Sequence, residues 1–408
     1  MTEADSASAI GAIGAVGVIG AGTMGAGIAQ LALEAGHEVR IHDVDAAAIE
    51  RGRARIRTGL ERRAARLDLD PESADAWVDG RLVRLTDAPT LAEVASVGPG
   101  LVIEAALEDL ELKRTIFHEL DALVPARTIL ATNTSALSVT AIAAAAMGRG
   151  RVVGLHFFNP APVMPLVEVI AASATDPAVV DRSMALMTHW GKVAVRSADT
   201  PGFIVNRVNR PFTLEALAML EAGGTSIETI DATVRADGFP LGPFELMDLT
   251  GIDISLAAAL AIFERSRAAD DPLSERFRPS PVQERLVAEG RLGRKTGRGF
   301  YRYDDAGRRL GPAPEFAPAD ASPDDGADPR TVERIVLAIV NEAYRAAGDG
   351  VATPADIDLA LRLGASHPSG PFERAAELGG PGAVLAALSA LAPAGPRFDP
   401  APSLRSAG

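Results

Sequence analysis

The sequence places a histidine and a glutamate on two consecutive apolar runs that are predicted to be buried strands. His156 closes the run RVVGLHF, and Glu168 stands inside the run LVEVI. A carboxylate inside such a strand is costly unless it is paired, and an imidazole is its natural partner. Glu168 would orient the ring and stabilise its protonated form, which suits His156 to general acid–base chemistry near neutral pH. The alternative interpretation is an exposed histidine beside an edge-strand glutamate.

The other residue types exclude several alternative chemistries. Five further histidines are less suited to acid–base work, because they flank a strand, lie in helical stretches or fall near the C-terminus: His37, His42, His118, His189 and His367. The chain has no cysteine and no clustered histidines, so no metal site is predicted. None of the three tyrosines has a lysine four residues on, which excludes a Tyr-x-x-x-Lys pair.

The stretch VGVIGAGTMGAGIAQLALEAGHEVRIHDVD, residues 16–45, predicts a cofactor site. A strand leads into G-x-G-x-x-G, a helix follows, and a second strand ends at Asp43. The glycines permit a tight turn, close approach of a pyrophosphate and close packing of the helix on the sheet. Asp43 would accept from a ribose 2′-hydroxyl and repel a 2′-phosphate, which favours NAD over NADP. The residues predicted to contact NAD here are Gly20, Ala21, Gly22, Thr23, Met24, Gly25 and Asp43.

Composition narrows the class of protein. A chain of 408 residues fits two or three domains, and a formal charge of -14 argues against a nucleic-acid partner or an anionic membrane surface. Residues 7–33 carry no charge, but their many glycines would make a poor lipid-spanning helix. Glu3 and Asp5 stand where a signal peptide would be basic. A soluble, cytoplasmic protein is expected, with residues 1–13 as a loose tail.

Strand and helix patterns predict the domain organisation. Further buried strands are predicted at residues 101–106, 128–131, 151–157, 166–170 and 192–195. Their alternation with helical segments indicates an α/β Rossmann-type domain, residues 14–199, with a doubly wound, mostly parallel sheet. After Thr200-Pro201-Gly202 the pattern is helical through residue 303, and residues 304–330 have the composition of a linker.

The helical half contains an internal repeat. Val205-Asn206-Arg207 matches Val332-Glu333-Arg334, and Glu215-Ala216 matches Glu342-Ala343, in one ungapped register. The register continues through Ile230-Asp231 and Ile357-Asp358 and then, after one inserted residue, through GPFE at 242–245 and 370–373. These matches predict an all-α domain in two copies, residues 200–303 and a shortened copy at 331–395.

An arginine-rich segment follows Asp43. Arg51, Arg55, Arg62 and Arg66 recur at helical spacing and would share one face of a helix. A solvated surface is the simpler interpretation, and a landing site for an anionic substrate is the other.

Five motifs carry a resemblance to a known family. They are HFFNPAPVMPLVEVI from His156, Asn133-Thr134-Ser135, PGFIVNR from Pro201, GPFELMD from Gly242 and GRKTGRGFYRY from Gly293. In this order they closely resemble the NAD-dependent 3-hydroxyacyl-CoA dehydrogenases over residues 15–303. The repeat resembles the duplicated C-terminal domain of longer 3-hydroxybutyryl-CoA and 3-hydroxyadipyl-CoA dehydrogenases.

The resemblance implies roles for individual residues. His156 would be the general acid/base with Glu168 as its partner, and Ser135 and Asn206 would bind the substrate oxygens. Further NAD contacts would fall on Glu108, Lys113, Ser135, Asn159 and Lys295. In this family the helix after the second strand helps bind coenzyme A, which favours Arg62 and Arg66 as substrate contacts. A serine that contacts CoA in some members is Gly59 here, so those contacts do not transfer directly.

The implied reaction is the reversible oxidation of an (S)-3-hydroxyacyl-CoA to a 3-ketoacyl-CoA, in fatty-acid or related acyl-CoA catabolism. The alternatives are a same-fold dehydrogenase of a hydroxy acid without CoA, of the gulonate or λ-crystallin type, and a non-catalytic NAD-binding protein. Because Asn206 becomes Glu333 in the second copy, that copy is expected to be structural. Either a homodimer or an intrachain pseudo-dimer through the duplicated domain is expected.

Overall fold

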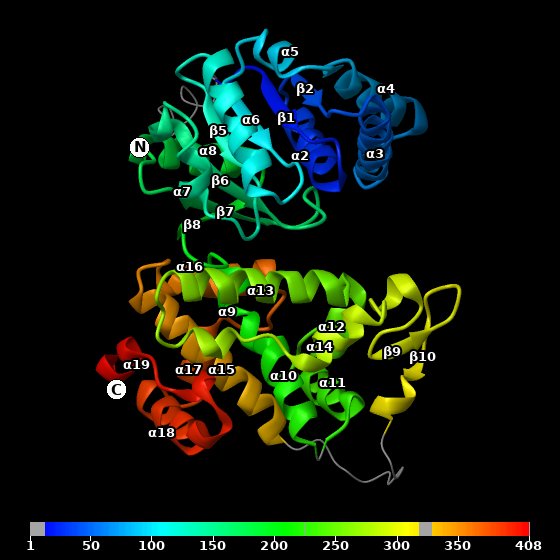
Figure 1. Ribbon diagram of the computed structural model, residues 1–408. Helices are drawn as coiled ribbons and strands as arrows, with labels where there is room; N and C mark the ends of the chain where they lie inside the picture. The colour runs from blue at the N-terminus through cyan, green and yellow to red at the C-terminus, as the bar shows by residue number, and fades with distance from the viewer. Residues whose placement is uncertain (1–12, 224, 318–328, 408) are drawn as a thin grey trace. The chain divides into compact units, whose positions relative to one another are not determined.

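A computed structural model describes residues 13–223, 225–317 and 329–407 (Figure 1). The chain divides into two compact units, Met1–Asp199 and Thr200–Gly408. The expected loose tail lies outside the described residues except for Ile13. That residue is 2% exposed and its carbonyl oxygen accepts from the Gly100 N–H at 2.9 Å, so Ile13 belongs to the folded unit and not to a tail.

The first unit is built on an eight-stranded sheet in the order β3-β2-β1-β4-β5-β6-β7-β8. The strands are β1 (Val16–Ile19), β2 (Val39–His42), β3 (Leu85–Asp87), β4 (Leu101–Glu104), β5 (Ile129–Thr132), β6 (Val152–Phe157), β7 (Leu166–Ala171) and β8 (Val193–Ala198). β6 and β7 pair antiparallel, and every other neighbouring pair is parallel. β1 lies between β2 and β4, so the strand order reverses there, and open α/β sheets bind ligands at such a point.

Helices cover both faces of this sheet (Figure 1). They are α2 (Thr23–Glu34), α3 (Ala46–Ala64), α4 (Pro71–Leu82), α5 (Leu91–Ala95), α6 (Leu110–Leu123), α7 (Val139–Ala143) and α8 (Pro177–His189). α2, α3 and α8 contribute to one apolar core with Val18, Ile103 and Leu155 of the strands. The predicted doubly wound, mostly parallel sheet is confirmed; the short strand β3 was not predicted.

In its described residues, the second unit is helical apart from one hairpin. Its helices are α9 (Val205–Val208), α10 (Arg210–Ala222), α11 (Ile227–Ala236), α12 (Pro243–Thr250), α13 (Ile252–Ala268), α14 (Pro281–Ala288), α15 (Pro329–Gly348), α16 (Pro354–Gly364), α17 (Pro371–Glu377), α18 (Pro381–Leu391) and α19 (Pro402–Ala407). Within the described ranges no single helix is long and apolar enough to cross a membrane, while two bent pairs, Pro243–Thr250 with Ile252–Ala268 and Pro371–Glu377 with Pro381–Ala394, meet these criteria together.

The first part of the expected linker is folded. β9 (Tyr301–Tyr303) pairs antiparallel with β10 (Arg309–Pro312), which lies inside the segment assigned to the linker by composition. Phe316 is buried against Phe300, with ring centroids 5.3 Å apart. Residues 304–317 therefore belong to the second unit, because apolar packing outweighs their polar, proline-rich composition. Residues 318–328 of the expected linker lie outside the described residues.

Two helix starts in the second unit have the same geometry. The Asp231 carboxylate accepts from the N–H groups of Phe244 and Glu245 at 3.0 and 3.1 Å, and a Cβ on Gly242 would lie 2.2 Å from it. At the start of α17, the Asp358 carboxylate accepts in the same way from Phe372 and Glu373, at 2.7 and 3.2 Å. The aspartates fix both helix starts.

Candidate active site

The glycines of the β1–α2 turn allow contacts that a side chain would prevent. Gly20 has φ +97°, and a Cβ there would lie 2.6 Å from the Ala105 carbonyl oxygen. A Cβ on Gly25 would lie 1.8 Å from the Gly20 carbonyl oxygen, so α2 packs this closely only with glycine. A Cβ on Gly22, in contrast, would meet no heavy atom within 4 Å. The space beside Gly22 is open to a ligand.

The N-terminus of α2 differs from the starts of the other α-helices described in this unit. Six helices begin at a residue whose side chain accepts a backbone N–H, namely Asp45, Asp70, Thr90, Asp109, Ser138 and Asp176. α2 begins at Gly22, and no side chain among the described residues caps it. The first N–H groups of a helix lack intrahelical partners and carry partial positive charge. They fit the pyrophosphate of a dinucleotide.

A cavity of about 840 Å³ opens from this turn along the ends of β1, β2 and β4. Gly20, Gly22 and Asp43 line it together with apolar side chains that include Leu107 and Ile116. Asp43 accepts from the Ala21 N–H through Oδ2 at 2.9 Å, which fixes its carboxylate at the wall of the cavity. An apolar cavity with a carboxylate in its wall beside an uncapped helix N-terminus fits the adenosine half of NAD.

Next to this cavity lies a buried ion-pair cluster that the sequence did not predict. Glu104 ends β4, and its Oε1 accepts from Lys113 Nζ at 2.6 Å while Oε2 accepts from Thr132 Oγ1 at 2.7 Å. Lys113 is only 1% exposed and also lies 3.4 Å from Glu108. The buried Lys113 side chain therefore links Glu104, at the end of β4, to Glu108. An acidic residue at the end of the apolar run LVIE was the available signal for Glu104.

Glu108 organises the loop after β5. Its Oε1 accepts from Thr134 Oγ1 at 2.7 Å, from Ser135 N and Oγ at 2.9 and 3.3 Å, and from Ala136 N at 3.1 Å. Burial alone would raise the pKa of Glu108, but the Lys113 charge and these hydrogen bonds hold it below its ordinary value. Asn133 Oδ1 accepts from the Phe157 N–H at 2.8 Å, so the loop that carries Ser135 is tied to the end of β6.

Sheet register brings His156 and Glu168 together. The two residues are direct partners in the antiparallel β6–β7 ladder. His156 Nδ1 lies 2.6 Å from Glu168 Oε2, and both side chains are buried. The Phe158 ring packs against the imidazole, with ring centroids 4.6 Å apart. The predicted contact is present, and Glu168 orients the imidazole through Nδ1.

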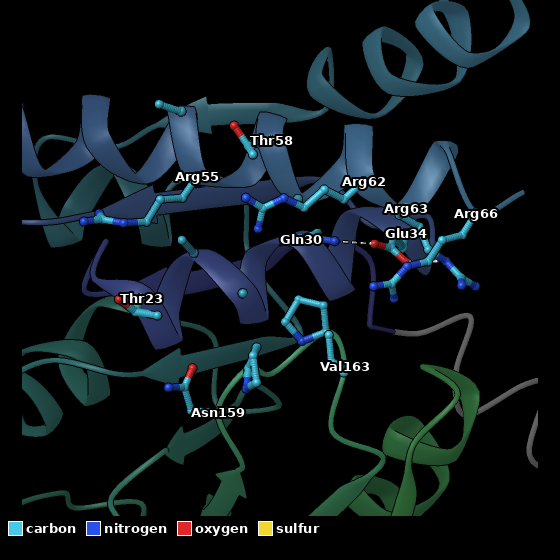
Figure 2. Close-up of a pocket in the computed structure, with 16 residues that line it drawn as sticks. Thr23, Gln30, Glu34, Arg55, Thr58, Arg62, Arg63, Arg66, Asn159 and Val163 are labelled. Atoms are coloured by element: carbon cyan, nitrogen blue, oxygen red, sulfur yellow. Dashed lines mark hydrogen bonds and ion pairs between the residues drawn. The ribbon is translucent and has the colours of Figure 1, made fainter. Parts of the chain in front are cut away.

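A second cavity, of about 590 Å³, lies along α2 and α3 (Figure 2). The predicted Arg62 and Arg66 line it, together with Arg55 and with Arg63, which was not predicted. Asn159 and Val163 approach from the opposite side of α2 in Figure 2. A Cβ on Gly59 would lie 2.0 Å from Gln30 Oε1, so Gln30 occupies the space that a side chain at position 59 would need. The other face arginine, Arg51, pairs with Asp45 and does not line the cavity.

Two of the predicted site residues, Asn206 and Lys295, lie in the second unit. Asn206 lies in α9 and lines a cavity of about 200 Å³ with residues of α10, α12 and α13. Lys295 Nζ lies 2.6 and 2.7 Å from the two carboxylate oxygens of Asp253 and remains 43% exposed.

Comparison with known proteins assigns the family. Residues 15–200 match the NAD-binding domain of 3-hydroxyacyl-CoA dehydrogenase, and residues 202–303 and 331–406 match its C-terminal domain. The chain belongs to the 3-hydroxyacyl-CoA dehydrogenase family. As a member, it is an NAD-dependent oxidoreductase that acts on a CH–OH group, and residues 15–200 match the domain that binds NAD in this family.

Relatives of this 3-hydroxyacyl-CoA dehydrogenase match from 70% to 97% of the chain. A 3-hydroxyadipyl-CoA dehydrogenase of Escherichia coli K12 is 37% identical, over 88% of this chain and 89% of the relative. A 3-hydroxybutyryl-CoA dehydrogenase of Bradyrhizobium diazoefficiens is 40% identical, over 70% of this chain and 94% of the relative. The crystal structure of 3-hydroxybutyryl-CoA dehydrogenase from E. coli K12 has a TM-score of 0.83 and 35% identity, and covers 97% of this chain and 98% of that one.

Proposed function

We propose that this dehydrogenase reversibly oxidises (S)-3-hydroxyadipyl-CoA or (S)-3-hydroxybutyryl-CoA to the 3-ketoacyl-CoA with NAD. The names of the E. coli and B. diazoefficiens relatives support these two substrates. The observation that carries the reaction is the buried 2.6 Å contact between His156 Nδ1 and Glu168 Oε2. This contact orients His156 as a base, and the pairing of β6 with β7 fixes that orientation.

His156 is the proposed general base. NAD, when bound, supplies the acceptor for the hydride that leaves C3 of the substrate. His156 takes the 3-hydroxyl proton at Nε2, because its Nδ1 is bonded to Glu168. The positive charge that then forms on the ring lies beside a buried carboxylate, which stabilises it. In the reductive direction, the imidazolium returns the proton to the 3-keto oxygen.

The other predicted site residues bind the substrate or NAD, or position a residue that does. Ser135 and Asn206 bind the substrate oxygens, and Glu108 positions Ser135 through the hydrogen bonds to its N–H and Oγ. Lys113 acts indirectly, since it is buried beneath Glu108 and holds that carboxylate in place. Asn159 and Lys295 keep their proposed roles as NAD contacts.

We infer that the arginine-lined cavity along α3 receives the phosphates of coenzyme A. Arg55, Arg62 and Arg66 line one cavity, are exposed, and carry positive charge on a chain of net charge -14. Arginine side chains bind phosphate oxygens through their planar, multidentate donors.

Exchange of Arg62 and Arg66 together for alanine should raise the KM for acetoacetyl-CoA by about 5- to 30-fold, because two exposed charge contacts contribute about 0.5–1 kcal/mol each. The KM for NADH should not change. Steady-state kinetics with acetoacetyl-pantetheine, which lacks the nucleotide phosphates, provides the comparison. Arg57→Ala is the matched control, because Arg57 lies on α3 but pairs with Asp79 and does not line the cavity. An equal rise in the KM of acetoacetyl-CoA and in the KM of acetoacetyl-pantetheine would contradict phosphate binding.

We further propose that residues from 331 onward are a second copy of the helical domain. Support comes from the matching helix starts at Asp231 and Asp358, and from the family match in two separate segments. The correspondence between the two copies continues beyond residue 395. Arg397 and the buried Phe398 correspond to Arg276 and the buried Phe277. The proposed copy therefore extends at least to Phe398.

The ion pairs between the proposed copies are reciprocal. Arg207 of the first copy binds Glu342 at 2.7 Å, and Arg334, at the register position of Arg207, binds Glu215 at 2.5 Å. Each carboxylate also binds a second arginine of the other copy, Arg276 on Glu342 at 2.7 Å and Arg397 on Glu215 at 2.5 Å. Reciprocal contacts of this kind are the mark of a two-fold interface. We therefore propose an intrachain pseudo-dimer, in which the second copy takes the place of a partner subunit.

A spectrophotometric assay tests the reaction against its two alternatives. Acetoacetyl-CoA with NADH should be reduced at rates typical of an enzyme, with kcat of about 1–10³ s⁻¹. Free 3-hydroxy acids with NAD should show little turnover. Turnover of the free acids alone would support a gulonate-type dehydrogenase. NADH binding without turnover of any of these substrates would support the non-catalytic alternative.

A further inference from the structure

Arg210 is a buried arginine without an acidic partner in the described chain. Its side chain lies at the start of α10 and the residue is 8% exposed. Nη1 makes one long hydrogen bond, 3.5 Å, to the Ser255 carbonyl oxygen, and Nε has no hydrogen-bond partner among the described residues. Burial lowers its pKa to about 10, so the guanidinium is still protonated at neutral pH. A buried charge is costly unless it is paired, so an unpaired one at the wall of a cavity points to a ligand that completes the pairing.

Two other buried arginines of this unit do not share this property. Arg207 and Arg276, from the same unit, both bind the carboxylate of Glu342. The proposed second copy offers an internal comparison, because Leu337 stands at the register position of Arg210. Leu337 is buried in α15, as Arg210 is in α10. An apolar residue therefore satisfies the packing of this position, and the charge at Arg210 needs another explanation.

Arg210 faces the same cavity as Asn206. The cavity has a volume of about 200 Å³, several times the roughly 30 Å³ share of one water molecule in the liquid. Its other walls include the apolar side chains of Leu246, Met247 and Ile254, which suit methylene groups. Asn206 lies in α9 and Arg210 is the first residue of α10, four positions further along the chain. A cavity lined by both side chains suits an acyl chain whose far end carries a negative charge.

We propose that Arg210 binds the terminal carboxylate of a 3-hydroxydicarboxylyl-CoA and thereby selects dicarboxylic over monocarboxylic acyl chains. This inference rests on the proposed function, in which Asn206 contacts the substrate oxygens. The carboxylate would receive N–H donors from the planar guanidinium, and the methylene groups would lie against Leu246, Met247 and Ile254. Between the two proposed substrates, the geometry favours 3-hydroxyadipyl-CoA.

The test compares two esters of equal chain length, (S)-3-hydroxyadipyl-CoA and (S)-3-hydroxyhexanoyl-CoA, with the full-length enzyme. Wild type should prefer the dicarboxylyl ester in kcat/KM. Arg210→Leu, which installs the residue of the proposed second copy, should reduce that preference by about 10- to 150-fold, since a hydrogen bond to a charged group contributes about 1.5–3 kcal/mol. Arg210→Lys, which keeps the charge but loses the planar donors, should retain part of the preference.

Arg345→Leu is the matched control. Arg345 is also buried with an unpartnered Nε, but it donates to the Asp399 carbonyl oxygen and does not line the cavity, so the preference should not change. If Arg210→Leu lowers kcat/KM equally for both esters, or for neither, the assignment of Arg210 to the carboxylate is wrong. Binding of adipyl-CoA and hexanoyl-CoA, which lack the 3-hydroxyl, repeats the comparison without catalysis. A failure of the proposed reaction then appears as absent turnover, whereas a failure of the Arg210 assignment appears as unchanged selectivity.

Discussion

Replacement of His156 by alanine is expected to lower kcat by about 10²- to 10⁴-fold, the usual contribution of a positioned general base. The imidazole is the proposed acceptor of the hydroxyl proton, and its ring is held by Glu168 at 2.6 Å. NADH affinity should be unchanged, because His156 does not line the cavity proposed for the nucleotide. Steady-state reduction of acetoacetyl-CoA gives kcat, and quenching of protein fluorescence gives the NADH dissociation constant.

Two further variants sharpen this test. Glu168→Gln keeps a hydrogen-bond acceptor beside Nδ1 but removes the charge that stabilises the imidazolium, so it should lose less activity than His156→Ala. His118→Ala is the matched control, since His118 lies on the exposed face of α6 and makes one 3.4 Å contact to the Ala145 carbonyl oxygen. If His156→Ala retains turnover within a few-fold of wild type, another group takes the proton and the assignment of the base is wrong.

The fold was predictable where burial leaves a simple pattern. Strands that are buried on both faces are continuous apolar runs, as in residues 16–19 and 101–103, and such a run can be recognised without knowledge of the neighbouring strands. β3 was not predicted because it has only three residues, of which Thr86 and Asp87 are exposed. The reversal of β7 was foreseeable: residues 158–165 are too few for the crossover that a parallel pair would need.

The catalytic pair was predictable because one residue was incompatible with its surroundings. Glu168 in an apolar strand required a partner, and the structure supplies His156. Arg210 gives no such signal, because the sequence shows an arginine but not the absence of an acid near it. That absence depends on the packing of α12 and α13, some 35 or more residues further along the chain. Glu104 likewise required the fold, which brings Lys113 from α6 beneath the end of β4.

Glu342→Ala is expected to destabilise the second unit by about 3–5 kcal/mol, the typical result of removing one partner from a buried ion pair. Glu342 is 3% exposed, and its loss leaves both Arg207 and Arg276 without this carboxylate. Glu215→Ala should have a similar effect, because Glu215 binds Arg334 and Arg397 in the reciprocal arrangement. Urea denaturation measures both. Glu275→Ala removes an exposed pair with Arg278 and should cost no more than about 1 kcal/mol.

The position of the aromatic residues separates the two units in this experiment. Trp77 and Trp190 lie in the first unit and all three tyrosines lie in the second. Tryptophan fluorescence should therefore be nearly unaffected by Glu342→Ala, while tyrosine absorbance reports the early unfolding of the second unit. A loss no larger than that of Glu275→Ala would contradict the reciprocal interface as a source of stability.

The pH dependence of the stability tests the interaction of Glu342 with the arginines independently. Burial alone would raise the pKa of Glu342, but the charges of Arg207 and Arg276 outweigh it and hold the pKa below its ordinary value. A carboxyl group whose pKa is depressed by folding stabilises the protein above its unfolded pKa of about 4.3 and loses that contribution as the pH falls through the folded pKa. The stability difference between wild type and Glu342→Gln should therefore be constant near neutral pH and shrink below about pH 4. A stability difference that grew on acidification would mean that Arg207 and Arg276 do not stabilise the ionised form of Glu342. The proposed pseudo-dimer would then lack one of its two reciprocal ion-pair clusters as a source of stability.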